Sequence, residues 1–335
     1  MKIYQKIILL ILSYNLTFAI TADQIYNQSW ALIIGIDEYK NVKNLDYASN
    51  DALMLKKILT TSFNFPDSNI TLMLNQEATK QNILQSFSNI AINANKGDRV
   101  LIFFAGHGET MDLPEGGEMG YIMPYEGSID NLYMSAIGMD EFRKISSMSK
   151  AKHILYLIDA CYGGLAAVGT RGLEPNIPNY IEKITIDDSR QIITAGGRNE
   201  KVIEKAEWGH SAFSLNLKRG LENGRADLNA DGIITTNELA LFLQEKVSID
   251  SENQQTPQYN RFTTQEGEFV FVFSDNTVVN NSININPNKD KLDVMIAKME
   301  SLEKKLSSPD NPKSLIESNP PTESYKDSIK TILKE

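Results

Sequence analysis

The sequence of 335 residues contains one cysteine, Cys161, and three histidines. A chain with a single cysteine cannot form an internal disulfide bond. Basic residues are also in short supply, with 33 Lys and Arg against 43 Asp and Glu and a net charge of −10. Because no basic stripe reverses this charge, the composition argues against non-specific binding to nucleic acid. No convincing internal repeat is present, which argues against a repeat architecture.

The first 19 residues have the pattern of a secretory signal peptide. Lys2 and Lys6 precede an apolar run over 7–12, and Ala19 ends a small-residue cleavage site. Polar residues from position 14 onward interrupt the apolar run before it reaches the ~20 residues of a membrane span. A cleaved signal is therefore favoured over an uncleaved anchor, and no cysteine lies near the cleavage point to make a lipoprotein. We expect an exported protein, periplasmic or secreted, without a stable membrane anchor.

Continuous apolar runs bounded by turn residues predict strands that are buried on both faces of a parallel sheet. These strands are expected over 30–36, 69–74, 98–104, 154–158, 190–195 and 267–273. Helical spacing of apolar residues predicts helices over 50–58, 80–94, 139–147, 211–221 and 238–246. The pattern predicts an α/β domain with a mainly parallel central sheet of about six strands flanked by helices.

The domain is expected to cover residues 20–275, after a signal peptide over 1–19. Residues 276–335 are polar and are expected to form a tail that is partly disordered. Within this tail, apolar residues over 292–306 follow an a/d spacing for only two heptads. Because a coiled coil needs a longer repeat, a solvated tail helix is favoured, and any self-association through it is expected to be weak.

Two chemically reactive side chains follow predicted buried strands. Cys161 follows the strand 154–158 and precedes two glycines, and His107 follows the strand 98–104 between two glycines. Reacting groups collect at the carboxyl ends of strands in open α/β sheets. A cysteine attacks as a thiolate, and His107 can supply the base that forms it. Backbone N–H groups of Gly108 and Cys161 are natural donors to an oxyanion.

Simpler interpretations of these residues stay open at this point. Most free cysteines are small buried apolar residues, and Cys161 could be one of them. His107 could equally belong to a surface loop. The remaining histidines, His153 and His210, are interpreted as structural.

Residues 227–238 read DLNADGIITTNE and match the calcium-loop pattern D-x-N-x-D-G-x5-E at every position. The expected ligands are Asp227, Asn229, Asp231, the Ile233 carbonyl, Thr235 directly or through water, and bidentate Glu238. Gly232 allows the sharp turn inside the loop, and predicted helices flank it on both sides. A single loop of this kind in an exported protein indicates a structural Ca²⁺ site. The alternative is an acidic turn that only looks like such a loop.

The sequences FFAGHG over 103–108 and IDACYGG over 158–164 resemble the histidine and cysteine motifs of caspase-fold cysteine peptidases. The closer resemblance is to the metacaspase and bacterial caspase-like branch. It extends roughly from Trp30 to Phe273 and includes WALIIGIDEY, NDALML, GHSAF and QTPQY in the same order. The resemblance implies a caspase-like sheet, with the calcium loop inserted before the last strand, and a His107–Cys161 dyad that cleaves peptide bonds.

The same resemblance implies a preference for basic substrates. Asp159 stands where caspases proper carry Gln in the Q-A-C-x-G motif, and metacaspases carry acidic residues at the positions of Asp51 and Asp159. A carboxylate two residues from the nucleophile attracts a cationic substrate side chain and repels an acidic one. The alternatives are a buried strut for Asp159 and a helix cap for Asp51. Arg171 and Lys183, in a segment over 165–189 that is predicted to be irregular, are candidate self-cleavage sites.

Two other classes of function stay open. One is a catalytically silent, caspase-like binding module stabilised by calcium, although such a module needs neither His107 nor Cys161. The other is a metal-dependent hydrolase that uses the acidic loop, although its ligand set matches a structural shell without an open position. A cysteine peptidase needs no cofactor for its chemistry, and its partner is a protein or peptide substrate with a basic residue at the cleavage site.

Overall fold

The computed structural model describes residues 20–160, 180–197 and 200–274. The predicted signal peptide, Cys161, Arg171 and the tail segment 292–306 lie outside these residues. Among the described residues, no helix combines the length and the apolar composition that crossing a membrane requires.

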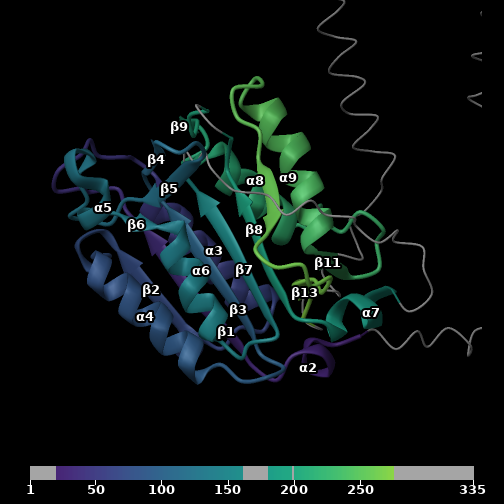
Figure 1. Ribbon diagram of the computed structural model, residues 1–335. Helices are drawn as coiled ribbons and strands as arrows, with labels where there is room; N and C mark the ends of the chain where they lie inside the picture. The colour runs from purple at the N-terminus through teal and green to yellow at the C-terminus, as the bar shows by residue number, and fades with distance from the viewer. Residues whose placement is uncertain (1–19, 161–179, 198–199, 275–335) are drawn as a thin grey trace, which may run out of the picture. The chain divides into compact units, whose positions relative to one another are not determined.

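Six strands form the central sheet in the order β12-β8-β7-β3-β1-β2, which confirms the predicted sheet (Figure 1). Their bounds are β1 Ser29–Gly35, β2 Ile70–Leu74, β3 Arg99–Ala105, β7 His153–Asp159, β8 Ser189–Thr194 and β12 Gln258–Arg261. Every pair is parallel except that of β12 with β8, which is antiparallel. The carboxyl ends of five strands therefore lie along one edge of the sheet.

Alternate residues of each central strand enter two apolar layers. On one face, residues such as Ile33 and Phe103 pack with α3 (Ala48–Ser62), α8 (Ala212–Leu221) and α9 (Thr236–Asp250). On the other face, residues such as Ile34 and Phe104 pack with α4 (Lys80–Asn93) and α6 (Met139–Met148), which lie together in Figure 1. This burial on both faces explains why the strands read as continuous apolar runs.

Two regions differ from the sequence prediction. The strand expected over 267–273 is shortened to β13 (Val270–Val272), and it pairs with β11 (Ile233–Thr235) outside the central sheet. The edge position is taken by β12, whose sequence QYNR has no apolar run because an edge strand is only partly covered. Part of the segment predicted to be irregular is helical and forms α7 (Tyr180–Ile186), since Tyr180 and Ile184 lie one turn apart and are both buried.

Smaller elements complete the described chain. The three-stranded sheet β4-β5-β6 comprises β4 (Gly108–Asp112), β5 (Glu118–Ile122) and β6 (Ile137–Gly138). A further pair is formed by β9 (Glu204–Lys205) and β10 (His210–Ser211). The short helices are α2 (Ala22–Ile25), α5 (Leu132–Ser135), η1 (Asp67–Asn69), η2 (Asn75–Glu77) and η3 (Ile129–Asn131).

The amino-terminal segment is fastened to the sheet by Tyr26. The Nε2 atom of His153 lies 2.9 Å from the Asp187 carbonyl, which can only accept, so Nε2 carries the proton. The His153 Nδ1 therefore accepts the Tyr26 hydroxyl proton at 2.7 Å, and the Val270 N–H donates to the same hydroxyl at 3.0 Å. Burial lowers the pKa of His153 to about 3, so this histidine is neutral and structural, as expected.

Candidate active site

His107 follows the end of β3, and the loop after β1 contacts it twice. Its Nε2 lies 2.7 Å from the Lys43 carbonyl oxygen. Because a carbonyl can only accept, Nε2 carries the proton and Nδ1 keeps the lone pair in the neutral ring. The His107 backbone N–H donates to the Tyr39 hydroxyl at 2.8 Å. Gly108, the expected oxyanion donor, is buried at the start of β4.

The strand that leads to Cys161 lies directly beside the strand that leads to His107. In the parallel pair of β3 and β7, Ala105 is opposite Asp159. The Gly106 N–H then donates to the Asp159 carbonyl at 3.2 Å. His107 and Cys161 each follow one of these paired residues by two positions in the sequence. Cys161 itself lies outside the described residues.

The two acidic residues predicted for substrate binding are brought together by Ser211. Asp51, in the first turn of α3, is 1% exposed and Asp159 is 3% exposed. The Ser211 N–H donates to Asp51 Oδ2 at 3.3 Å, and its hydroxyl donates to Asp159 Oδ2 at 2.5 Å. The Ser214 hydroxyl donates to the same Asp159 oxygen at 2.6 Å. Asp159 Oδ1 is buried and has no hydrogen-bond partner among the described residues.

Burial makes both carboxylates reluctant to ionise. It raises the pKa of Asp159 to about 8, and the negative charge of Asp51 adds to this effect. Burial also raises the pKa of Asp51, against the opposing effect of His210, whose Nδ1 lies 2.5 Å from Asp51 Oδ1. The site is therefore short of positive charge, and a cation placed there would favour ionisation of both acids.

Glu204 adds a third carboxyl group that the sequence interpretation missed. It lies in β9 opposite Ser211 of β10, so it flanks the two aspartates. Burial raises the pKa of Glu204 to about 7, and the charges of Asp51 and other acids contribute. His210, interpreted as structural from the sequence, is also part of this site through Asp51. His210 and Ser211 belong to the segment GHSAF, which is part of the family resemblance and could have indicated that these residues lie at the site.

The calcium-loop residues form a compact turn closed by their own hydrogen bonds. The Gly232 N–H donates to Asp227 Oδ2 at 2.9 Å, and the Asp231 N–H donates to Asn229 Oδ1 at 2.9 Å. Gly232 has a φ of +85°, which glycine adopts at little cost. Glu238 spans the loop, because its carboxylate accepts the Leu228 N–H at 3.2 Å and the Thr235 N–H at 2.9 Å. Thr235 itself caps α9 through its hydroxyl.

The donor chemistry of this loop fits a hard cation such as Ca²⁺. Burial raises the pKa of both Asp227 and Glu238, and in each case neighbouring acidic charges, including Asp231, raise it further. Bound Ca²⁺ would neutralise the negative charge of the loop carboxylates and would accept neutral amide and carbonyl oxygens as further ligands. In the described part of the chain, no three His, Cys, Asp or Glu side chains are gathered as in a formed metal site. Ile233, whose carbonyl is one of the expected ligands, is the first residue of β11.

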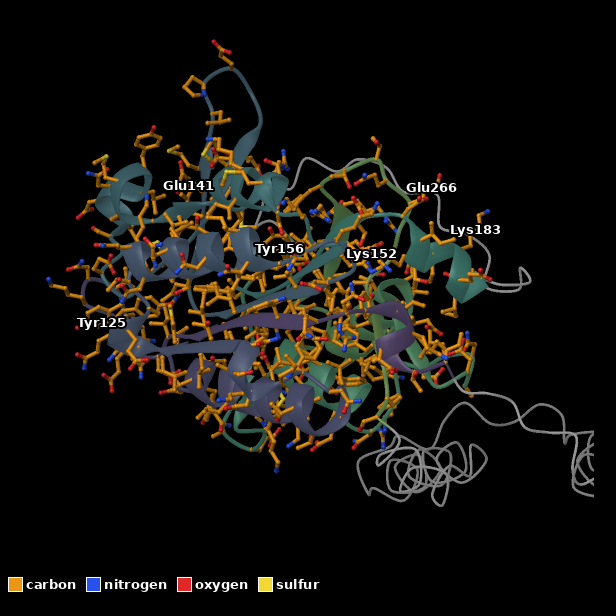
Figure 2. All side chains as sticks on the ribbon, turned by 90° about the horizontal axis from the view of Figure 1, so that it is seen from below. Tyr125, Glu141, Lys152, Tyr156, Lys183 and Glu266 are labelled. Carbon is orange, nitrogen blue, oxygen red and sulfur yellow. The ribbon has the colours of Figure 1, made fainter. Side chains whose placement is uncertain are left out.

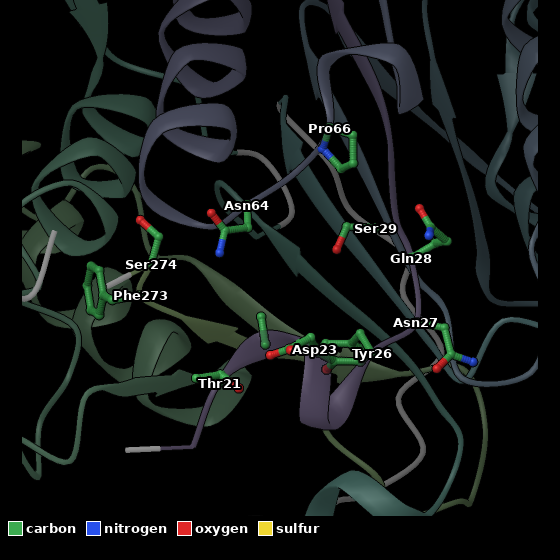
Figure 3. Close-up of a pocket in the computed structure, with 11 residues that line it drawn as sticks. Thr21, Asp23, Tyr26, Asn27, Gln28, Ser29, Asn64, Pro66, Phe273 and Ser274 are labelled. Carbon is green, nitrogen blue, oxygen red and sulfur yellow. The ribbon is translucent and has the colours of Figure 1, made fainter. Parts of the chain in front are cut away.

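A separate cavity of about 450 Å³ lies at the amino-terminal end of the strands (Figure 3). It is lined by residues from α2 and the segment after it, the start of β1 and the segment after α3, including Tyr26, Ser29 and Asn64. None of the candidate site residues lines it, so it does not belong to the site around His107. Lys183, a candidate self-cleavage residue, is exposed on α7 at the edge of the molecule in Figure 2.

Comparison with known proteins identifies related chains. Residues 28–267 match the model of the caspase domain. Metacaspase-1 of Plasmodium falciparum is 28% identical over 152 residues, which cover 41% of this chain and 24% of that protein. Metacaspase-2 of Arabidopsis thaliana is 28% identical over 149 residues, which cover 42% of this chain and 35% of that protein. A probable protease of a Desulfuromonadales bacterium is 28% identical over 151 residues, which cover 40% of this chain and 18% of that protein. The matches thus span about a third or less of these relatives' own lengths.

Replacing Asp159 with Asn should change the pH dependence of stability. Folded Asp159 keeps its proton up to pH about 8, whereas an unfolded aspartate loses it near pH ~3.9. The folded state therefore binds more protons in this window, so the free energy of unfolding falls as pH rises. In Asp159→Asn that fall should be shallower by up to about 1.4 kcal/mol per pH unit. Urea unfolding at pH 5 and pH 8.5 measures it.

The control for this measurement is Asp130→Asn, which changes an exposed aspartate of η3. It should keep the wild-type slope. An Asp159→Asn slope equal to that of the wild type would show that Asp159 is already ionised when buried.

Proposed function

The chain belongs to the caspase domain family, and we propose that it is an exported cysteine endopeptidase that cleaves after Arg or Lys. The observation that carries this proposal is the position of His107 at the same sheet edge as the buried carboxyl groups of Asp51 and Asp159. A base and an acidic binding site at one edge match the needs of a peptidase with basic specificity. The motif that contains Cys161 supplies the nucleophile.

In this mechanism His107 acts through its Nδ1 atom, because Nε2–H donates to the Lys43 carbonyl oxygen. Nδ1 takes the thiol proton of Cys161, and the thiolate attacks the scissile carbonyl carbon. Backbone N–H groups of Gly108 and Cys161 stabilise the resulting oxyanion. The imidazolium then gives its proton to the leaving amine as the C–N bond breaks. Water, deprotonated by the same Nδ1, hydrolyses the thioester and releases the thiol.

The preference for basic substrates follows from the positive charge that is missing around Asp51, Asp159 and Glu204, which together form the acidic cluster. Asp159 Oδ1 is buried without a partner in the described part of the chain, so it is available to accept from a lysine ammonium or an arginine guanidinium. An acidic side chain would instead add negative charge next to Asp51, Asp159 and Glu204. Entry of a cation also favours release of the protons that the buried carboxyl groups hold.

The loop over 227–238 is proposed to bind Ca²⁺ for stability rather than for chemistry. The side chains of Asp227, Asn229, Asp231 and Glu238 and the Ile233 carbonyl would hold the ion, with Thr235 contributing through water. Binding would join the start of α9 to β11, which pairs with β13. The ion would neutralise the acidic groups of the loop.

Export and self-processing complete the proposal. Residues 1–19 would direct the chain to a periplasm or to the outside of the cell and would then be removed. Arg171 and Lys183 are the proposed self-cleavage sites. Because Lys183 lies in α7, cleavage there would require local opening of this helix. Weak self-association is assigned to 292–306.

Peptide cleavage by the chain without its signal tests the peptidase proposal. Fluorogenic peptides ending in Arg or Lys should be cleaved, and a matched peptide ending in Asp should not. Cys161→Ala and His107→Ala should each lower kcat/KM by at least about 10³-fold, because each removes one member of the dyad.

The alternatives give different results in the same assay. Cleavage after Asp would contradict the roles of Asp51 and Asp159. Activity that survives Cys161→Ala but not chelation would indicate a metal-dependent hydrolase. If no peptide is cleaved even after nicking at Arg171 or Lys183, the peptidase proposal fails and the binding module is favoured.

Thermal unfolding with and without calcium tests the metal proposal. Ca²⁺ at 100 times its dissociation constant should stabilise the folded chain by about 2.7 kcal/mol. Glu238→Gln should remove this calcium effect, whereas Glu245→Gln, which changes an exposed glutamate of α9, should keep it. Equal melting temperatures in calcium and in chelator would show that the loop is only an acidic turn.

A further inference from the structure

The loop after β1 lies beside His107 because of the strand order. β1 pairs directly with β3 in parallel, and Gly35 is opposite Ala105, so the loop after β1 leaves the sheet next to the chain that continues from β3 to His107. Hydrogen bonds hold this loop in place. Asn44 Oδ1 accepts the Tyr39 N–H at 2.9 Å, and the Lys40 N–H donates to the Tyr125 carbonyl at 2.9 Å.

Tyr39, on this loop, contacts His107 through both its hydroxyl and its ring. The hydroxyl accepts the His107 N–H at 2.8 Å, and the two rings lie 4.9 Å apart at an interplanar angle of 48°. Tyr39 is only 8% exposed, so water does not readily replace this hydrogen bond. Burial, together with the charges of Asp37 and Glu204, raises the pKa of Tyr39. The residue is therefore a neutral hydroxyl and not a base.

Gly106 provides the space that Tyr39 occupies. A Cβ atom at position 106 would overlap the Tyr39 hydroxyl oxygen and would lie 2.8 Å from the Phe104 ring. The absence of a side chain at this position lets the hydroxyl approach the backbone immediately before His107. The end of β3 and the loop after β1 are thus fitted closely to each other.

We infer that Tyr39 is a positioning residue for His107, on the observation that its buried hydroxyl holds the His107 backbone while the Lys43 carbonyl holds ring Nε2. With the backbone held on one side and ring Nε2 on the other, Nδ1 keeps one direction, and the neutral ring carries its proton on Nε2. Tyr39 acts only through His107, so the inference rests on the proposed function, in which His107 is the base for Cys161. Such orientation contributes to catalysis because small displacements of a base are costly.

Alkylation of Cys161 by iodoacetamide tests this inference directly, because Cys161 is the only cysteine of the chain. In the wild type, pairing with His107 should keep the thiolate populated and alkylation fast at pH 6. Tyr39→Phe keeps the ring and removes the hydrogen-bond acceptor. It should slow alkylation at pH 6 by about 3- to 10-fold and lower kcat to a similar extent with KM unchanged. At pH 10, where any thiol ionises, its alkylation rate should equal that of the wild type.

Tyr26→Phe is the matched control. Tyr26 is a similarly buried tyrosine, 4% exposed, whose hydroxyl bonds His153 and Val270 in the amino-terminal anchor. Its variant should lose stability but should keep the wild-type alkylation profile and kcat. A profile that changes equally in both variants would reduce the role of Tyr39 to general stability and would contradict the inference.

His107→Ala separates failure of the inference from failure of the proposed function. If His107→Ala slows alkylation at pH 6 but Tyr39→Phe does not, the dyad stands and the positioning role is wrong. If His107→Ala leaves the profile unchanged, the dyad fails and Tyr39 loses its role with it.

The double variant tests the close fit between Gly106 and Tyr39. Gly106→Ala should lower activity less in the Tyr39→Phe background than in the wild type, because the overlap with the hydroxyl is absent there. An equal loss of activity in both backgrounds would contradict the close fit.

Discussion

Parallel pairing of β3 with β7 is the constraint on which the site depends. It sets Ala105, the last residue of β3, opposite Asp159, the last residue of β7, and in the sequence His107 and Cys161 each follow two positions later. Both strands are buried on both faces, so a slip in register would move every side chain into the wrong apolar layer. The packing of the core therefore fixes the two strand ends that precede the proposed dyad residues in the sequence, and loops and helix starts add the other groups of the site.

The acidic cluster is the costly part of this arrangement. Asp51 and Asp159 are buried, and His210 is the only side chain capable of positive charge that the described residues place in hydrogen-bond contact with them. Hydroxyl donors and retained protons reduce the cost of burial but leave one oxygen of Asp159 without a partner in the described residues. Burial of carboxyl groups without enough positive charge lowers stability, and such a conflict is typical of a binding site, because a ligand can supply the missing positive charge.

The sheet was predictable from the sequence because buried strands carry a local signal of continuous apolar residues. The placement of Asp51 and Asp159 at one edge followed from the same strands and from the family resemblance. Glu204 and His210 were missed because they belong to the short pair β9–β10, and the hydrogen bonds that join this pair to Asp51 and Asp159 connect residues 52 to 160 positions apart. The Lys43 contact is made by a backbone carbonyl, so side-chain identity gives no signal for it. β12 was missed because an edge strand carries little apolar pattern.

The proposed function requires a basic side chain of the substrate to occupy the acidic cluster while Cys161 reacts. The most direct measurement is a crystal structure of the chain after reaction with a peptidyl-arginyl chloromethyl ketone. We expect a covalent bond to the Cys161 sulfur and a guanidinium within hydrogen-bond distance of Asp51 and Asp159 Oδ1. An adduct whose guanidinium lies in solvent, or against residues other than these acids, would contradict it.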